Sequence, residues 1–393
     1  MFLKKINLTN FRNYSNLELE FDNRPTVLVG NNAAGKSNIL EAVYLLSTTK
    51  SLRVETEDEL IKEGQDFTKV EGFLESNGET ELLVIINKQS LRSDDLKPNK
   101  EVLFRKKVLV NGVPRRVTDF IGNLPAVIFY PSDINLVTGS PSLRRWHLDL
   151  GLAQVDPVYK KALTAYEQFL TARNRVLKRI REGYGKKDEL TYWTDGLLSQ
   201  GKLISQKREG FFEFVNTLDK PLGEFMFEYK PSAVTVERLT ETNGREVAAA
   251  ATLVGPHRDD FRIILDDYVI ARSKATKQSN SEIAALPSVV RNDGGGGRDM
   301  AHYGSRGEQR TATLAFKLAQ LEYMTKILGK RPILLLDDVF SELDASHRAH
   351  VVEIVSKQQT IIATVELENI PQEFLDSARI LRVEDGKIVE IRN

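Results

Sequence analysis

A glycine-rich octapeptide at residues 30–37 constrains the fold of this chain more than any other feature. It matches the phosphate-binding loop (P-loop) pattern G-x-x-x-x-G-K-[ST] and lies between the strand-like run 26–29 and apolar residues at helical spacing. In such a strand–loop–helix unit, backbone N–H groups face a phosphate, the lysine reaches the β and γ oxygens, and the last hydroxyl can ligate Mg²⁺. The predicted nucleotide-binding residues are Gly30, Asn31, Asn32, Ala33, Ala34, Gly35, Lys36 and Ser37.

A second motif, at residues 331–338, places two carboxylates directly after four aliphatic side chains. A buried strand that ends in an aspartate brings a carboxylate beside the Mg²⁺ of a P-loop, and Asp337 takes that role together with Ser37. Asp338 can then orient or deprotonate the attacking water, so Asp338 and Lys36 are the predicted catalytic residues. Aspartate is shorter than the more usual glutamate, which predicts slow hydrolysis. For this motif alone, a core strand capped by solvated acids is the alternative.

A third motif, residues 305–309, precedes a helix-like stretch. A hydroxyl at a helix N-cap followed by a glycine offers an oxygen and free N–H groups to an anion, so Ser305 and Gly307 are further candidates for nucleotide contact. Alone, such a cap usually marks only the start of a helix. Here it precedes Asp337, and the acidic stretch 341–344 follows, an order that favours a functional role.

Two further patterns indicate antiparallel strands and a helical arm. Asn77-Gly78 and Asn111-Gly112 are hairpin turn signals between strand-like runs. On both sides of a turn at 183–187, apolar residues recur every seven positions, which predicts two helices folded into a short antiparallel coiled coil, or alternatively an ordinary amphipathic pair against the core. In the first helix the expected seam is Leu163, Leu170 and Leu177, with Tyr159, Tyr166 and Ile180 beside it and Arg173 interrupting it.

These patterns suggest a division of the chain into a head and an arm. Residues 1–150 and 231–393 would form one α/β head, with the P-loop in its first lobe and the other two motifs in a lobe at 301–393. Residues 151–230 would form the helical arm. Residues 271–300 are rich in serine, lysine, asparagine and glycine, so we expect a flexible insertion loop.

Composition limits the class of protein. Apolar residues make up 41% and charged residues 28% of the chain, which is typical of a globular protein. Cysteine is absent, and this excludes disulfides and thiol chemistry. No apolar run is long enough for a membrane span and residues 1–14 do not resemble a signal peptide, so we expect a cytoplasmic protein.

Charge gives a local rather than a general argument for nucleic-acid binding. Lysine plus arginine equals aspartate plus glutamate at 55 each, so the whole chain has no net attraction for phosphate. Residues 101–116 and 159–187 are nevertheless strongly basic, and the alternative for both is a solvated face. The candidate DNA contacts are Arg105, Lys106, Lys107, Arg115 and Arg116 in the first stretch, and Arg173, Arg175, Lys178, Arg179 and Arg181 on the arm.

The three motifs in this order resemble the ABC-type ATPase heads shared with SMC proteins, in which a P-loop, a signature serine, a Walker B strand and a D-loop recur. From Phe2 to about Ile391 the chain resembles the RecF family more closely. The resemblance implies an α/β, ABC-type P-loop ATPase head, with a mixed sheet and an antiparallel β lobe, and a helical arm domain. The signature keeps Ser305 and Gly307 but has Arg306 and Glu308 where glutamine is usual. The stretches that carry the resemblance are 10–14, 131–133, 144–149, 253–260 and 336–344.

The resemblance also implies cofactors and an assembly. ATP and Mg²⁺ would be bound, and Arg12 would contact a phosphate of the nucleotide, with a surface salt bridge as the alternative for Arg12. The signature serine of an ABC-type head caps the γ-phosphate held by the opposite subunit. ATP would therefore join two copies into a homodimer with two composite sites, and hydrolysis would release them.

The implied function is recombinational repair and replication-fork maintenance. The dimer would bind DNA at single-strand gaps or duplex junctions, with weak DNA-stimulated ATPase activity. It would help to load a recombinase together with RecR-type and RecO-type mediator proteins. An ABC-type ATPase with a non-repair role is one alternative. A P-loop phosphotransferase is less favoured, because the sequence shows no lid-like arginine cluster and a kinase has no use for the signature.

Overall fold

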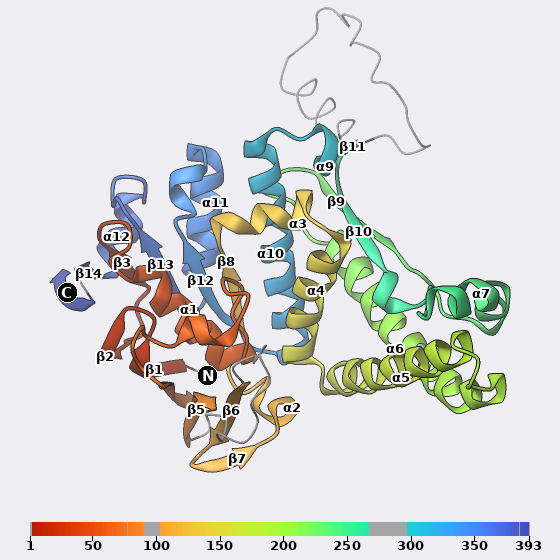
Figure 1. The fold of residues 1–393 in the computed structure, drawn as a ribbon. Coiled ribbons are helices and arrows are strands. Elements are labelled where there is room, and N and C mark those ends of the chain that lie inside the picture. Colours follow the sequence, from red (N-terminus) through yellow and green to blue (C-terminus); the bar gives the residue numbers. More distant parts are fainter. Residues whose placement is uncertain (1, 77, 90–102, 267–296, 385, 393) are drawn as a thin grey trace, which may run out of the picture. The chain divides into compact units, whose positions relative to one another are not determined.

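The computed structural model describes residues 2–76, 78–89, 103–266, 297–384 and 386–392 (Figure 1). The expected flexible loop at 271–300 lies outside these residues, apart from 297–300. The chain divides into two compact units. The first comprises Met1–Pro131, Ala153–Val155 and Met324–Asn393, and the second comprises Ser132–Leu152 and Asp156–Tyr323.

The antiparallel sheet of the first unit confirms the hairpin predicted at Asn111-Gly112, whereas Asn77 of the other predicted turn lies outside the described residues. Asn111 and Gly112 both have positive φ, 51° and 72°, which the tight turn requires and which asparagine and glycine tolerate. In the described residues the strand order is β2-β1-β4-β5-β6-β7. The strands are β1 (Phe2–Phe11), β2 (Tyr14–Glu20), β4 (Phe67–Ser76), β5 (Gly78–Gln89), β6 (Leu103–Val110) and β7 (Val113–Arg115).

The second sheet of this unit is mainly parallel. β15 pairs antiparallel at one edge, and the order in the described residues is β15-β14-β3-β13-β12-β8. Its central strands are continuous aliphatic runs because both faces are covered, and the four aliphatic residues of β12 are at most 1% exposed. The strands are β3 (Thr26–Val29), β8 (Ala126–Phe129), β12 (Ile333–Asp337), β13 (Thr360–Thr364), β14 (Arg379–Glu384) and β15 (Lys387–Arg392).

Helix α1 (Lys36–Thr48) lies between these two sheets and follows the P-loop. It packs on strands of both sheets, so almost its whole circumference is buried, including Ile39, Leu40 and Val43 at 0% exposure. A helix that is apolar all round is expected where both sides are covered. The other helical segments of the first unit are η1 (Glu57–Leu60), α2 (Val117–Phe120), η5 (Phe340–Glu342), α11 (Ala345–Val355) and α12 (Gln372–Ser377).

The second unit contains the predicted helix pair. Asp156 caps the first helix by accepting the N–H groups of Val158 and Tyr159, and Gly183, with φ 88°, begins the turn between the two helices. A three-stranded sheet, β11-β10-β9, and the long helix α10 as far as Tyr323 belong to the same unit. The elements are η2 (Pro131–Ile134), α3 (Asn135–Thr138), α4 (Pro141–Val155), α5 (Pro157–Arg181), η3 (Lys187–Leu190), α6 (Thr191–Asn216), β9 (Phe225–Lys230), α7 (Val236–Ala249), η4 (Pro256–Arg258), β10 (Asp260–Leu265), β11 (Arg298–Asp299), α9 (Met300–Tyr303) and α10 (Arg306–Leu328).

The predicted seam of α5 is partly wrong. Leu177 is fully buried, but Leu163 and Leu170 are only half-buried. Arg173 does not interrupt the packing, because it is itself buried and its guanidinium donates to Glu246 Oε2 at 2.7 Å. Glu246 belongs to α7, a helix that was not predicted from the sequence, and α7 packs on α5. The buried face of α5 is therefore set by two neighbouring helices rather than by one coiled-coil partner.

Candidate nucleotide site and signature helix

The P-loop runs from the end of β3 to the start of α1, and its two glycines are required by close contacts. A Cβ at Gly30 would lie 2.2 Å from the carbonyl oxygen of Val383. Gly35 has φ 114°, and a Cβ there would lie 2.5 Å from the hydroxyl of Tyr14. Lys36 Nζ donates to the carbonyl oxygens of Gly30 and Asn31 at 2.8 and 2.9 Å, so the ammonium lies inside the loop.

The structure brings the predicted metal-binding pair together. Ser37 Oγ donates to Asp337 Oδ1 at 2.9 Å, although the two residues are 300 positions apart in the chain. Burial raises the pKa of Asp337, because the charged carboxylate is taken out of water at the end of β12. Burial likewise lowers the pKa of Lys36. A hydroxyl and a desolvated carboxylate beside a phosphate-binding loop fit Mg²⁺, which usually takes one or two protein ligands and completes its shell with water and phosphate.

Asp338 has a backbone conformation that is unusual outside glycine. Its φ is 52°, in the left-handed region, where aspartate is tolerated better than most residues. Its N–H donates to the carbonyl oxygen of Ala363 at 2.8 Å, and its own carbonyl accepts the Ser341 hydroxyl at 2.8 Å. Its charge, with that of Asp337, raises the pKa of Lys36 against the effect of burial. Both aspartates therefore lie within electrostatic reach of the P-loop lysine.

Arg12 is engaged in an ion pair with a buried acid. Its guanidinium donates to both carboxylate oxygens of Glu41, at 2.8 and 2.9 Å, and to the carbonyl oxygen of Glu59 at 2.9 Å. Glu41 is on α1 and its side chain is 1% exposed, so this is not the surface salt bridge considered above. The phosphate contact of Arg12 stays a prediction.

Two residues outside the predicted site contact the P-loop and the start of α1: Asn13, from the stretch 10–14, and Arg53, which no sequence motif selected. Asn13 Nδ2 donates to the carbonyl oxygen of Ala34 at 3.3 Å, and Asn13 Oδ1 accepts from Asn38 at 2.8 Å. Arg53 donates to Asn38 Oδ1 at 3.0 Å, and its positive charge partly offsets the burial that raises the pKa of Asp337. Arg53 lies beyond the end of α1 in an irregular segment. Its place near the nucleotide site is therefore seen only in the folded structure.

The signature residues lie in the second unit, at the start of α10. Ser305 and Glu308 form a reciprocal cap: Ser305 Oγ accepts from the Glu308 N–H at 3.3 Å, and Glu308 Oε2 accepts from the Ser305 N–H at 2.8 Å. Gln309 donates to the carbonyl oxygen of Met300 at 2.9 Å and so ties α10 to α9. Ser305 and Gly307 are exposed, and a Cβ at Gly307 would meet no atom within 4 Å.

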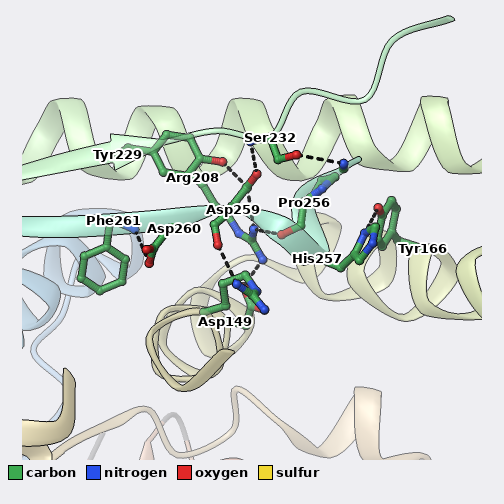
Figure 2. A network of polar contacts seen from close by, with 12 residues as sticks. Asp149, Tyr166, Arg208, Tyr229, Ser232, Pro256, His257, Asp259, Asp260 and Phe261 are labelled. Carbon is green, nitrogen blue, oxygen red and sulfur yellow. Dashed lines mark hydrogen bonds and ion pairs between the residues drawn. The ribbon is translucent and has the colours of Figure 1, made fainter. Parts of the chain in front are cut away.

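Residues 252–260, which include the stretch 253–260, form a largely buried strap held by Arg208 of α6 (Figure 2). Arg208 donates to Asp259 Oδ2 at 2.7 Å, to the Pro256 carbonyl oxygen at 2.8 Å and to Asp149 Oδ1 at 2.8 Å. Asp259 also accepts the Ser232 N–H at 2.6 Å. A buried guanidinium is tolerated here because its donors meet carboxylates and carbonyls.

The same strap is held along α5 by polar side chains at a spacing of seven. Tyr159 Oη accepts from Arg208 Nε at 3.0 Å, Tyr166 Oη bonds to His257 Nδ1 at 2.7 Å, and Arg173 Nη1 donates to Thr252 Oγ1 at 2.7 Å. Tyr166 and Arg173 thus contact the strap directly, whereas Tyr159 contacts Arg208, which in turn holds the strap.

The structure corrects both basic stretches. Arg173 is buried and paired, so it does not belong to a DNA-facing surface. Lys106 is largely buried, donates to the carbonyl oxygen of Thr49 at 2.7 Å and pairs with Glu57. The remaining basic residues are exposed to different degrees, namely Arg105, Lys107, Arg115 and Arg116 near β6 and β7, and Arg175, Lys178, Arg179 and Arg181 on α5.

Three features define the ABC-type P-loop ATPase head. The P-loop helix lies between an antiparallel and a mainly parallel sheet, the Walker B aspartate bonds to the P-loop serine, and the signature helix begins with a cap. The family model described as RecF/RecN/SMC N terminal domain matches residues 2–387. A relative from Oceanobacillus iheyensis is named DNA replication and repair protein RecF. It is 32% identical over an alignment of 412 positions, which covers 99% of this chain and all of the relative. The chain belongs to the RecF family.

Solved structures agree with this assignment. The chain is similar to a structure described as the recombination mediator protein RecF-ATP in the RecFOR pathway, with a TM-score of 0.79, 27% identity and coverage of 100% of this chain and 98% of the other. An Smc head domain from Pyrococcus furiosus, with a TM-score of 0.51 and 16% identity over 99% of this chain and 96% of the other, shares the fold. Within the described part of the chain, the helices lack the length and apolarity that crossing a bilayer demands.

Proposed function

We propose that this chain is an ATP-dependent DNA-binding protein of recombinational repair and replication-fork maintenance, acting in the cytoplasm as a homodimer that ATP assembles. The observation that carries the proposal is the Ser37 to Asp337 hydrogen bond of 2.9 Å, with Lys36 in the adjacent loop, in a chain related to RecF proteins over its whole length. A P-loop lysine, a hydroxyl and a buried aspartate are together the minimum set for a Mg²⁺-nucleotide.

In this proposal, Lys36 exchanges its two carbonyl acceptors for the β and γ oxygens of ATP, and the N–H groups of residues 30–37 face the phosphates. Ser37 and Asp337 would hold Mg²⁺, which supplies charge neutralisation on the phosphates. Asp338 orients the attacking water and accepts its proton, and its short side chain predicts slow hydrolysis.

The distribution of motifs supports a dimer. The P-loop and Asp337 belong to the first unit, whereas Ser305 and Gly307 lie exposed at the start of α10 in the second. In ABC-type heads the signature completes the nucleotide site of the opposite copy. ATP would therefore join two chains across two composite sites, with DNA at single-strand gaps or junctions and RecR-type and RecO-type mediators as partners in loading a recombinase.

The first experiment is light scattering and DNA binding, each with ATP, ADP and no nucleotide, on the wild type and Lys36→Ala. The proposal expects a dimer and tight DNA binding only for the wild type with ATP. A protein that stays monomeric with ATP would contradict it and favour the phosphotransferase. An ATP-induced dimer that does not bind DNA would favour an ABC-type ATPase with a non-repair role.

The DNA surface is tested by salt titration of binding. Neutralising three of Arg105, Lys107, Arg115 and Arg116 should reduce the steepness with which duplex affinity falls with salt, by about 0.9 for each phosphate that the variant no longer neutralises. Neutralising Arg175, Lys178 and Arg181 on α5 removes the same charge, so each triple variant is the control for the other. An unchanged slope for both would place the DNA surface elsewhere.

A further inference from the structure

Glu308 places a negative charge at the helix end that a phosphate would approach. Its carboxylate accepts the Ser305 N–H at 2.8 Å within the first turn of α10. That hydrogen bond lowers the pKa of Glu308, so the side chain is charged at neutral pH. The exposed hydroxyl of Ser305 and the carboxylate of Glu308 therefore share one helix N-terminus. An anion that approaches Ser305 meets repulsion from Glu308 unless this charge is balanced.

Arg298 supplies the balancing charge. Its Nη2 lies 3.1 Å from Glu308 Oε1, whereas the bond to Ser305 uses the other carboxylate oxygen, so one carboxylate serves both partners. Arg298 is held by backbone pairing, since β11 pairs with β10 through Leu265. Both side chains are about one-third exposed, at 34% and 35%, so the pair lies at the surface where a second copy would dock.

The surrounding contacts fix this pair relative to the signature. Asp299, next to Arg298, caps α9 by accepting the Ala301 N–H at 2.9 Å. The buried Gln309 side chain then joins α9 to α10 by its bond to the Met300 carbonyl oxygen. The strand that carries Arg298 and the helix that carries Ser305 are therefore held as one local assembly, and the Arg298 charge is preorganised rather than recruited.

We propose that Arg298 is a positioning residue for the composite nucleotide site: it neutralises Glu308, so that Ser305 at the start of α10 can receive the γ-phosphate held by a second copy of the chain. This inference rests on the proposed ATP-dependent dimer. It explains how a glutamate can stand where the family usually has an uncharged glutamine, because the arginine on the neighbouring strand restores the neutral balance.

Three variants test the proposal: Arg298→Gln, Glu308→Gln and the double variant. Glutamine at 308 can still accept the Ser305 N–H, so the cap survives while the charge is removed. Arg298→Gln should weaken ATP-dependent dimerisation about tenfold, the scale of one unbalanced charge in a partly screened interface. Glu308→Gln should dimerise at least as well as the wild type, and the double variant should return to within about twofold of the wild type.

Two measurements accompany the dimerisation constants, which are taken from light scattering at several protein concentrations. Binding of a fluorescent ATP analogue under dilute, monomeric conditions should be the same for all variants, since the P-loop belongs to the first unit. The control is Lys230→Gln, which removes the same charge from β9, where the lysine pairs with Glu228 at 3.9 Å. We expect this variant to dimerise within about twofold of the wild type.

The outcomes separate the inference from the function on which it rests. If Arg298→Gln dimerises like the wild type, Arg298 has no positioning role. If the double variant stays as weak as Arg298→Gln, the arginine acts directly on the phosphate and not through Glu308, and the proposal is overturned. A wild type that remains monomeric with ATP refutes the proposed function, and the inference with it.

Discussion

Replacing Arg208 by methionine tests whether the polar strap holds the second unit together. Arg208 and Asp259 have side chains that are 2% and 1% exposed, and they form an ion pair at 2.7 Å. Without the guanidinium, the carboxylate of Asp259 keeps the Ser232 N–H and the Tyr229 hydroxyl among the described contacts, and Asp149 loses its ion pair as well. Removing one partner of a buried pair leaves an uncompensated charge. The free energy of unfolding should therefore fall by about 3–5 kcal/mol.

The assay is denaturant unfolding followed by tryptophan fluorescence. The chain has two tryptophans, Trp146 and Trp193, and both lie in the second unit, so the signal reports on the unit that contains the strap. The matched control is Arg179→Met on the same helix pair, whose ion pair with Glu189 at 3.0 Å is solvent-exposed. Its removal should cost no more than about 1 kcal/mol.

A double variant sharpens the result. Adding Asp259→Asn to Arg208→Met removes the uncompensated charge, so it should recover part of the stability. If Arg208→Met unfolds at the same denaturant concentration as Arg179→Met, the strap does not depend on Arg208 and the reasoning fails. If Asp259→Asn brings no recovery, poorer packing rather than unpaired charge explains the effect.

Three further predictions concern the nucleotide site and the pH dependence of folding. Lys36→Ala should abolish ATP hydrolysis with no change in the circular dichroism spectrum, and full activity would refute the assignment of the P-loop. Asp338→Asn should allow ATP-induced dimers to form and persist, whereas Asp337→Asn should weaken Mg²⁺-dependent nucleotide binding itself; unchanged turnover in Asp338→Asn would mean that another group activates the water. Burial and the charge of Lys317 hold the pKa of His147 well below its usual range, so the unfolded chain gains a proton near pH 6.5 that the folded chain does not. Stability should therefore fall as the pH drops below about 6.5, by up to about 1.4 kcal/mol per pH unit for this group, and His147→Gln should show a shallower fall in the fluorescence assay.

The first unit was largely predictable from the sequence because its information is local. The P-loop is eight consecutive residues, and β12 is an aliphatic run that ends in Asp337. Both are recognisable as elements from adjacent residues alone, and the hairpin at Asn111 follows from turn chemistry. The contacts of Arg12 and Arg53 were not predictable in this way, because Glu41 and Asn38 become their neighbours only after the two sheets enclose α1.

The packing of α5 in the second unit escaped prediction for a different reason, although the helix pair itself was predicted. A heptad pattern considers only apolar side chains, and on that basis Arg173 interrupts the predicted seam. The structure makes Tyr159, Tyr166 and Arg173 members of one buried stripe, whose partners lie elsewhere in the chain: Glu246 is 73 residues from Arg173. A buried charge at a seam position is stable only if a distant segment supplies the opposite charge. No local sequence pattern identifies that segment. The strap at 252–260 therefore demands particular residues because its buried polar groups must meet fixed partners on α5 and α6.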